Sequence, residues 1–158
     1  MFAIRLINLI ESRADKLSEG LLSKLEKAPQ CRELMKRVPK EEVRRRTFEI
    51  YHNLTDWLLS KTEAEIEERY IGLGMRRARQ AVPFSAFLWA VGCTKEHLWE
   101  FLEAEGMLEQ PLELFGELGL AHSMARFFDH LLYSASIGYE AIRQEEAQRL
   151  QEHYAAVS

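Results

Sequence analysis

The stretch YIGLGMRRARQAVP, residues 70–83, combines two glycines and three arginines at the end of a segment that the flanking sequence predicts to be helical. Gly72 and Gly74 remove side chains from an otherwise apolar helix surface, so that a large side chain or another backbone can approach closely there. Trp89 and Trp99 are the candidates for that neighbour. The stretch therefore predicts a tight helix contact within the fold or with a partner.

The arginines of this stretch admit two interpretations. Arg76, Arg77 and Arg79 form the basic end of the helix expected over residues 63–80, whose acidic start carries four glutamates, and both ends complement the helix dipole. The arginines either finish the helix and bind nearby glutamates, or they line a pocket for an anion. We favour the first interpretation and keep the second open.

Helical periodicity extends from this stretch over nearly the whole chain. Only four prolines and eight glycines interrupt it, and no segment shows the period-two alternation of strands. A short turn or helix is expected over residues 30–37, and a short helix or irregular lead-in over 112–119. The main helices are expected over residues 2–27, 39–59, 63–80, 84–105 and 121–154. The sequence thus predicts an all-α fold, a five- to six-helix bundle with a long C-terminal helix.

Length and composition favour one helical sensor or interaction domain over residues 1–158. The 158 residues are 47% hydrophobic and 29% charged, as is typical of a globular fold. The net charge of -4 gives no strong field toward nucleic acid, and no apolar run is long enough to span a membrane. The two cysteines, Cys31 and Cys93, show no CxxC spacing and no cleavable signal precedes them, which predicts a cytoplasmic location.

Two of the expected helices carry more than one apolar face. The helix over 84–105 has a second stripe at Trp89, Gly92, Cys93 and Trp99, and the terminal helix has one at Phe128, Leu132 and Tyr139. A cluster of small residues over 134–138 would let another helix approach closely. Such helices are buried on two sides, either by other helices of the same chain or at a subunit contact. We favour a homodimer.

Catalytic and metal-binding patterns are weak in this sequence. There is no nucleophile elbow, no assembled Ser/His/Asp or Cys/His grouping and no phosphate-binding loop. Cys93 and His97 lie four residues apart on one helix, and His122 and His130 lie eight apart on the last, so any of them could ligate haem or a single metal. We expect no enzyme activity, metal site or cofactor. A haem- or metal-binding sensor or oxidoreductase is the alternative.

The run over residues 70–102, YIGLGMRRARQAVPFSAFLWAVGCTKEHLWEFL, resembles the amino-terminal domain family of the RsbRD co-antagonists of the bacterial stressosome. That family shows an aromatic residue, then leucine-glycine, an arginine pair and a small-apolar-Pro hinge into an amphipathic helix. The residues in those places are Tyr70, Leu73, Gly74, Arg76, Arg77 and Pro83. Gly72 and Cys93 have no place in the pattern, and Ala81-Val82 replaces the more usual glycine-containing approach to the proline.

The resemblance implies a helical, dimeric input domain without catalytic activity, found at the front of stress-signalling, kinase or transcription-regulator proteins. Related stressosome input domains have a globin-like fold without haem. No effector segment follows residue 158, so the chain is either a free-standing version or an excised piece. The expected partners are a second copy, a signalling protein or a small-molecule ligand. We expect the contacts to be made by Tyr70, Gly74, Arg76, Arg77, Trp89, Cys93, Trp99, Phe128 and Leu132.

Overall fold

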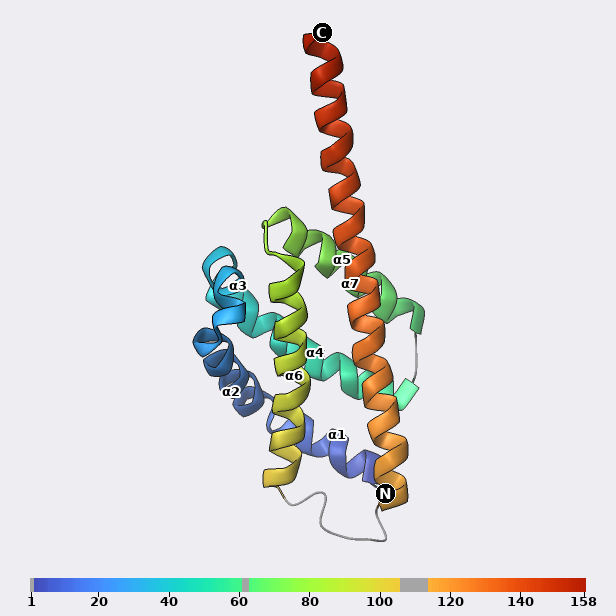
Figure 1. Cartoon of the computed structure of the whole chain (residues 1–158). Coiled ribbons are helices and arrows are strands. Elements are labelled where there is room, and N and C mark those ends of the chain that lie inside the picture. The colour runs from blue at the N-terminus through green and yellow to red at the C-terminus, as the bar shows by residue number, and fades with distance from the viewer. Residues whose placement is uncertain (1, 61–62, 106–113) are drawn as a thin grey trace.

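The structure, a computed structural model, describes residues 2–60, 63–105 and 114–158, and Figure 1 shows their arrangement. Within these ranges the chain forms seven α-helices and one short 3-10 helix, with no strand, which confirms the predicted all-α fold. The helices are α1 (Phe2–Ser12), α2 (Ala14–Lys27), η1 (Pro29–Cys31), α3 (Arg32–Arg37), α4 (Lys40–Ser60), α5 (Glu63–Arg79), α6 (Phe84–Ala104) and α7 (Leu114–Val157).

The helices pack around α7, the longest of them. Helix α5 crosses α7, α6 lies along its other side, and α4 passes behind both α6 and α7 (Figure 1). Helix α2 packs between α4 and α6, and α1 contacts α4 near the start of α7. Each amphipathic helix therefore buries its apolar stripe against one or more of the other helices.

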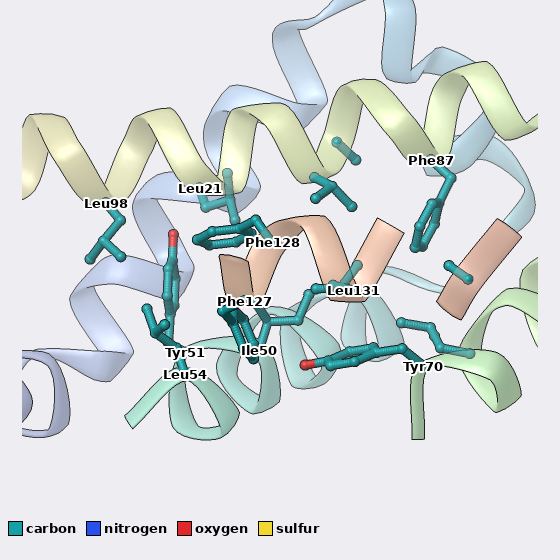
Figure 2. Close-up of a cluster of buried hydrophobic side chains, with 14 of the residues drawn as sticks. Leu21, Ile50, Tyr51, Leu54, Tyr70, Phe87, Leu98, Phe127, Phe128 and Leu131 are labelled. Atoms are coloured by element: carbon teal, nitrogen blue, oxygen red, sulfur yellow. The ribbon is translucent and has the colours of Figure 1, made fainter. Parts of the chain in front are cut away.

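Aromatic side chains fill the centre of the core. Tyr51, Tyr70 and Phe127 are nearly inaccessible to solvent and lie among leucines from several helices (Figure 2). The Tyr51 hydroxyl donates to the carbonyl oxygen of Thr94 at 3.1 Å, which ties α4 to α6. This hydrogen bond allows Tyr51 to be buried without the loss of stability that an unpaired hydroxyl would cause.

The first predicted helix, residues 2–27, is in fact two helices. The chain leaves helical geometry at Arg13, where φ is -119° and ψ is 15°. Helix α1 packs mainly on α4, whereas α2 packs on both α4 and α6. One straight helix could not bury Leu6 and Leu17, both fully inaccessible, against these different neighbours. No proline or glycine lies at this bend, so the sequence gives no signal of a helix break there.

The terminal helix is longer than the predicted residues 121–154, because α7 runs from Leu114 to Val157. Residues 114–119 of the expected lead-in are helical, and residues 112–113 lie outside the described part of the chain. Every residue from Arg143 onward is exposed, and this part of α7 projects beyond the other helices (Figure 1). We call residues 143–157 the α7 extension. Among the described helices, none combines the length and the apolar character needed to cross a lipid bilayer.

The turn between α5 and α6 is a Schellman motif. The amide of Ala81 donates to the Ala78 carbonyl at 2.9 Å, and the amide of Val82 donates to the Arg77 carbonyl at 3.1 Å. Ala81 has a φ of 60°, the left-handed conformation for which glycine is the usual residue. Pro83 is the N-cap residue of α6, which begins at Phe84. The turn thus fixes the direction of α6 at the cost of local strain in Ala81.

Candidate functional site

The glycines of the opening stretch differ in their surroundings. A Cβ atom added at Gly74 would lie 2.1 Å from the carbonyl oxygen of Ala135, and one added at Gly138 would lie 2.2 Å from that of Ile71. Helices α5 and α7 therefore touch backbone to backbone, and we call this contact the α5–α7 crossing. The expected close contact exists, but the neighbour of Gly74 is α7 and not one of the tryptophans. A Cβ at Gly72 would meet no atom within 4 Å.

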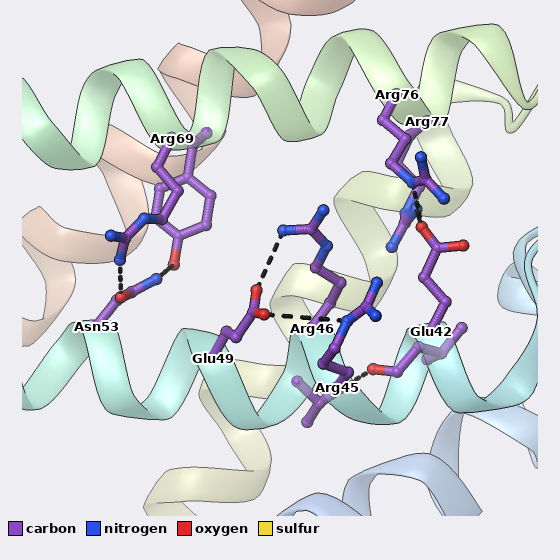
Figure 3. Close-up of polar contacts among 11 residues, drawn as sticks. Glu42, Arg45, Arg46, Glu49, Asn53, Arg69, Arg76 and Arg77 are labelled. Atoms are coloured by element: carbon purple, nitrogen blue, oxygen red, sulfur yellow. Dashed lines mark hydrogen bonds and ion pairs between the residues drawn. The ribbon is translucent and has the colours of Figure 1, made fainter.

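Glu42 of α4 is the residue that the arginines bind (Figure 3). Its carboxylate accepts hydrogen bonds from Arg76, from Arg77 at 3.1 Å and from the Gln80 amide at 3.2 Å. Arg77 also donates to the Gln80 side-chain oxygen at 2.7 Å. Glu42 and Arg77 are both buried. The first of the two interpretations of the arginines is therefore confirmed, with a partner that nothing in the local sequence identified.

We call Glu42, Arg76, Arg77 and Gln80 the Glu42 cluster, and its hydrogen bonds favour the ionised form of the Glu42 carboxyl. The hydrogen bond from Arg76, reinforced by the buried Arg77, lowers the pKa of the Glu42 carboxyl to about 2. Burial in turn lowers the pKa of Arg77, and Glu42 opposes that effect. A buried charge pair of this kind is costly to break, because removing one partner leaves the other charge without compensation. The cluster therefore fixes the start of α4 against the end of α5.

Tyr70 belongs to the core and not to an open site. Its hydroxyl accepts a hydrogen bond from the Asn53 amide at 3.0 Å, and Arg69 donates to the Asn53 oxygen (Figure 3). Its ring meets the edge of Phe127 with centroids 6.1 Å apart. Burial raises the pKa of Tyr70, which keeps the hydroxyl protonated. Tyr70 thus links α5 to α4 and α7.

The second apolar face of α7 is largely covered within the chain. Phe128 is buried and packs edge-on against Phe127, with centroids 5.3 Å apart. Leu132 is half-buried against the core, and so is Trp99 of α6. These three predicted contact residues therefore lie mainly in packing between helices.

Part of the second apolar face of α6 remains open. A hollow of about 550 Å³ lies along this helix. Leu88 is 45% exposed and Trp89 49% exposed at its edge, and a Cβ added at Gly92 would meet no atom within 4 Å. The space beside Gly92 is therefore not filled by any described residue. We call this feature the α6 hollow, lined by Lys24, Ser85, Leu88, Trp89, Gly92, Cys93, Lys95, Glu96, His97 and Glu100.

Charged side chains surround the α6 hollow. Lys24 of α2 forms an exposed ion pair with Glu100 of α6, a contact worth little by itself but one that bridges the two helices. His97 lies so close to α2 that a Cβ at Gly20 would stand 2.8 Å from its ring. Burial lowers the pKa of His97, so its imidazole is neutral near pH 7, and its Nδ1 atom is buried without a hydrogen-bond partner.

The two cysteines meet at the α6 hollow, although no spacing in the sequence suggested it. Cys31 at the end of η1 is fully buried, and Cys93 of α6 is half-buried and lines the hollow. The two thiols lie close enough for each to affect the pKa of the other. Burial raises the pKa of Cys31 to about 11 and also raises that of Cys93, so both are protonated at neutral pH. Only the packing of η1 against α6 brings them together.

The candidate haem or metal ligands do not converge. Cys93 and His97 line the same hollow, but His122 is exposed on α7 and His130 packs at a tilt against Trp57 with ring centroids 5.4 Å apart. Over residues 2–60, 63–105 and 114–158, no three metal-ligating side chains come together. The arrangement gives no observation that favours the metal-binding alternative.

The α7 extension carries a row of exposed apolar residues. Leu150 is 58% exposed, Tyr154 71% and Val157 73%. Together with Ala147 they follow steps of three, four and three residues, the spacing of the a and d positions of a coiled coil. At the base of the extension Arg79 approaches Glu145 to 3.9 Å. We call Ala147, Leu150, Tyr154 and Val157 the α7 seam.

Comparison with known proteins gives one match. A family model described as the RsbT co-antagonist protein rsbRD N-terminal domain matches residues 23–153, from the second half of α2 to near the end of α7. No curated protein and no solved structure matches the chain. The matched range contains the α5–α7 crossing, the Glu42 cluster and the α6 hollow.

Proposed function

The chain belongs to the RsbT co-antagonist protein rsbRD N-terminal domain family, and on this basis we propose that residues 1–158 act as one non-catalytic input module of bacterial stress or transcriptional signalling. In this proposal a stimulus acts at the α6 hollow, and α7 carries the response to a partner. The observation that carries the proposal is the continuity of α7. One helix of 44 residues is clamped to the body in its middle and projects from it at its end.

The α5–α7 crossing supports transmission through α7. Backbone contact at Gly74 and Gly138 leaves no side chain that could rearrange to absorb a movement of α5. A shift of α5 must therefore move α7 as a whole. Because the extension continues the same helix at about 1.5 Å per residue, a tilt at the crossing grows toward its tip.

Aromatic packing connects the input side to the same helix. Phe84 and Phe87 of α6 pack against Tyr139 of α7, with centroids 5.0 and 5.9 Å apart. Tyr139 lies one residue beyond Gly138 of the crossing and four before the extension. The volume of the α6 hollow is within the range of sites that hold small molecules. A ligand or partner that moves α6 would therefore press on α7 just below the extension.

We propose that the output involves a second copy of the chain, paired through the α7 seam as a parallel coiled coil. In that arrangement Glu146 would face Gln151 of the other copy, and His153 would face Ser158, so no like charges meet beside the seam. Two heptads bury little surface, and we therefore expect a weak, concentration-dependent homodimer.

Sedimentation velocity over a range of concentrations tests this output. We expect a reversible monomer–dimer equilibrium in the unmodified chain and a monomer in the variants Leu150→Glu and Tyr154→Glu. Gln148→Glu, which adds the same charge outside the seam, is the matched control and should still dimerise. A chain that stays monomeric at the highest attainable concentration, or seam variants that dimerise like the control, would refute pairing through the seam.

A second experiment addresses the input. If the α6 hollow receives a ligand or partner, tryptophan fluorescence should respond through Trp89 when candidate small molecules are added, and Gly92→Leu should abolish the response without lowering the melting temperature. Gly92→Leu should be tolerated because a side chain at this position meets open space. A response that persists in Gly92→Leu would place the input elsewhere.

A further inference from the structure

The contact between Cys31 and Cys93 has a chemical consequence that the family does not supply. The two thiols come from η1 and α6, which pack against each other, and they lie close together where Cys93 lines the open α6 hollow. We propose that Cys31 and Cys93 form an internal disulfide when a hydroperoxide enters the α6 hollow. The stimulus class of the input module would then be a small oxidant.

The position of Cys31 is fixed by the core and not by a surface loop. Its amide donates to the Ala28 carbonyl at 3.1 Å within a turn that begins at Pro29. Its side chain belongs to the same buried cluster as Leu25, Leu34 and Leu98. Two thiols held close together by such packing can approach the S–S bond length of about 2.05 Å by side-chain rotation.

The difference in exposure between the thiols assigns their order of reaction. The half-buried Cys93 meets the oxidant first: its thiolate sulfur attacks one peroxide oxygen, the O–O bond breaks, and the leaving hydroxide takes up a proton to become water. Cys93 is then a sulfenic acid. Cys31 loses its proton and attacks the Cys93 sulfur, and the displaced hydroxide accepts that proton. Two thiols and one hydrogen peroxide thus give one disulfide and two waters.

Charges at the hollow affect the rate of the first step. Burial raises the pKa of Cys93 and slows its ionisation, whereas the ammonium group of Lys24 nearby favours the thiolate. Since burial is the larger influence, we expect slower oxidation of Cys93 than of a free cysteine. The second step needs no encounter, because the resolving thiol of Cys31 is already in contact.

The role of the disulfide in signalling rests on the proposed function, but the bond itself does not. Oxidation would tie η1 to α6 beside Lys24 and turn the Cys93 sulfur toward the core, which changes the lining of the α6 hollow. This would alter α6, the helix that presses on Tyr139 of α7.

To test this, the reduced full chain is treated with hydrogen peroxide and the oxidant is removed. The intact mass and the free thiols of the chain are then measured. We expect the loss of two hydrogen atoms and of both titratable thiols, reversal by dithiothreitol, and a peptide map that joins the segments around Cys31 and Cys93. Recovery of two free thiols, or of a disulfide between two chains only, would overturn the proposal.

Two variants separate the roles of the thiols. In Cys31→Ser we expect Cys93 to stop at the sulfenic acid, which dimedone traps. In Cys93→Ser we expect Cys31 to stay reduced at the same peroxide dose, because it is buried. Circular dichroism melting checks that both variants fold. Should Cys31 oxidise as fast in Cys93→Ser as Cys93 does in Cys31→Ser, the assigned order of reaction is wrong.

Sedimentation of the oxidised chain distinguishes this inference from the proposed function. A disulfide that forms in a chain that never dimerises supports the thiol chemistry and refutes the output through α7. A chain that dimerises through the α7 seam yet keeps two free thiols after peroxide refutes the disulfide and leaves the proposed output supported.

Discussion

Gly74 of α5 and Ala135 of α7 lie in backbone contact, so close that a Cβ atom on Gly74 would stand 2.1 Å from the Ala135 carbonyl oxygen. Gly138, one turn further along α7, makes the reciprocal approach to α5. The two helices therefore interlock through missing side chains. This contact joins α5, in the body of the fold, to α7, the only described helix that projects from it.

Substitution of the crossing glycines should destabilise the fold. In Gly74→Ala and Gly138→Ala the added methyl group meets backbone atoms, which cannot rotate away, and we expect a loss of about 3 kcal/mol in the free energy of unfolding. Gly72→Ala is the matched control, since its methyl group meets open space, and it should stabilise the helix by about 1 kcal/mol. Urea denaturation measures all three. Equal effects at Gly72 and Gly74 would contradict the crossing.

Loss of the Glu42 carboxylate should also destabilise the chain. Glu42→Gln leaves the buried Arg77 without a counterion, and we expect a loss of about 3 kcal/mol in the free energy of unfolding. Glu41→Gln removes a charge from the same first turn of α4, but at a side chain that is 78% exposed, and should change stability by less than about 0.5 kcal/mol. Denaturant unfolding at pH 7 measures both variants. A similar loss in the free energy of unfolding of the two would mean that the Glu42 cluster does not stabilise the fold.

Acid should remove the contribution of Glu42 in a defined pH range. Its pKa is about 2 in the folded chain against an ordinary value of 4.5, so the folded state favours the ionised form. The resulting stabilisation is fully present above pH 4.5 and is lost as the pH falls from 4.5 toward 2. Thermal unfolding measured across this range should show a smaller decline in Glu42→Gln than in the unmodified chain. Parallel declines would mean that Glu42 is not held as its hydrogen bonds indicate.

Relief of backbone strain at the α5–α6 turn should stabilise the chain. Ala81→Gly removes the steric cost of a φ of 60°, and after the greater flexibility of glycine in the unfolded state we expect a gain of about 0.5 to 1 kcal/mol. Ala125→Gly, at an exposed and regular position of α7, should instead cost about 1 kcal/mol. The pair is compared by melting temperature, and a loss of stability in Ala81→Gly would show that the turn is not strained.

Haemin should not bind in a specific, coordinated state. His97 is packed against α2, His130 against Trp57, and Cys93 against Cys31, so none presents a free ligand with a second one opposite. We expect haemin added to the purified chain to give the spectrum of free haemin, without a sharpened Soret band. A Soret band that disappears in His97→Ala but persists in His122→Ala would restore the haem-binding alternative.

Local patterns predicted much of the fold correctly. Apolar spacing located α4, α5 and α6 to within a few residues, and also the C-terminal end of α7, because a helix buries one face whatever its neighbour is. The glycines and small residues predicted a close helix contact, and the arginines predicted a bound glutamate. These features depend on residues a few positions apart, which the sequence displays directly.

The tertiary structure alone decided which residues meet. The partner of Gly74 is Ala135, the partner of Arg77 is Glu42, and the partner of Cys93 is Cys31, all from distant parts of the chain. The break at Arg13 likewise follows from the different helices that α1 and α2 pack against. The sequence determines how much apolar surface of each helix has to be buried and how many charges need partners. Which helix buries a given apolar surface depends on how all the helices pack together, because the hydrophobic effect is non-directional and many pairings satisfy the same periodicity.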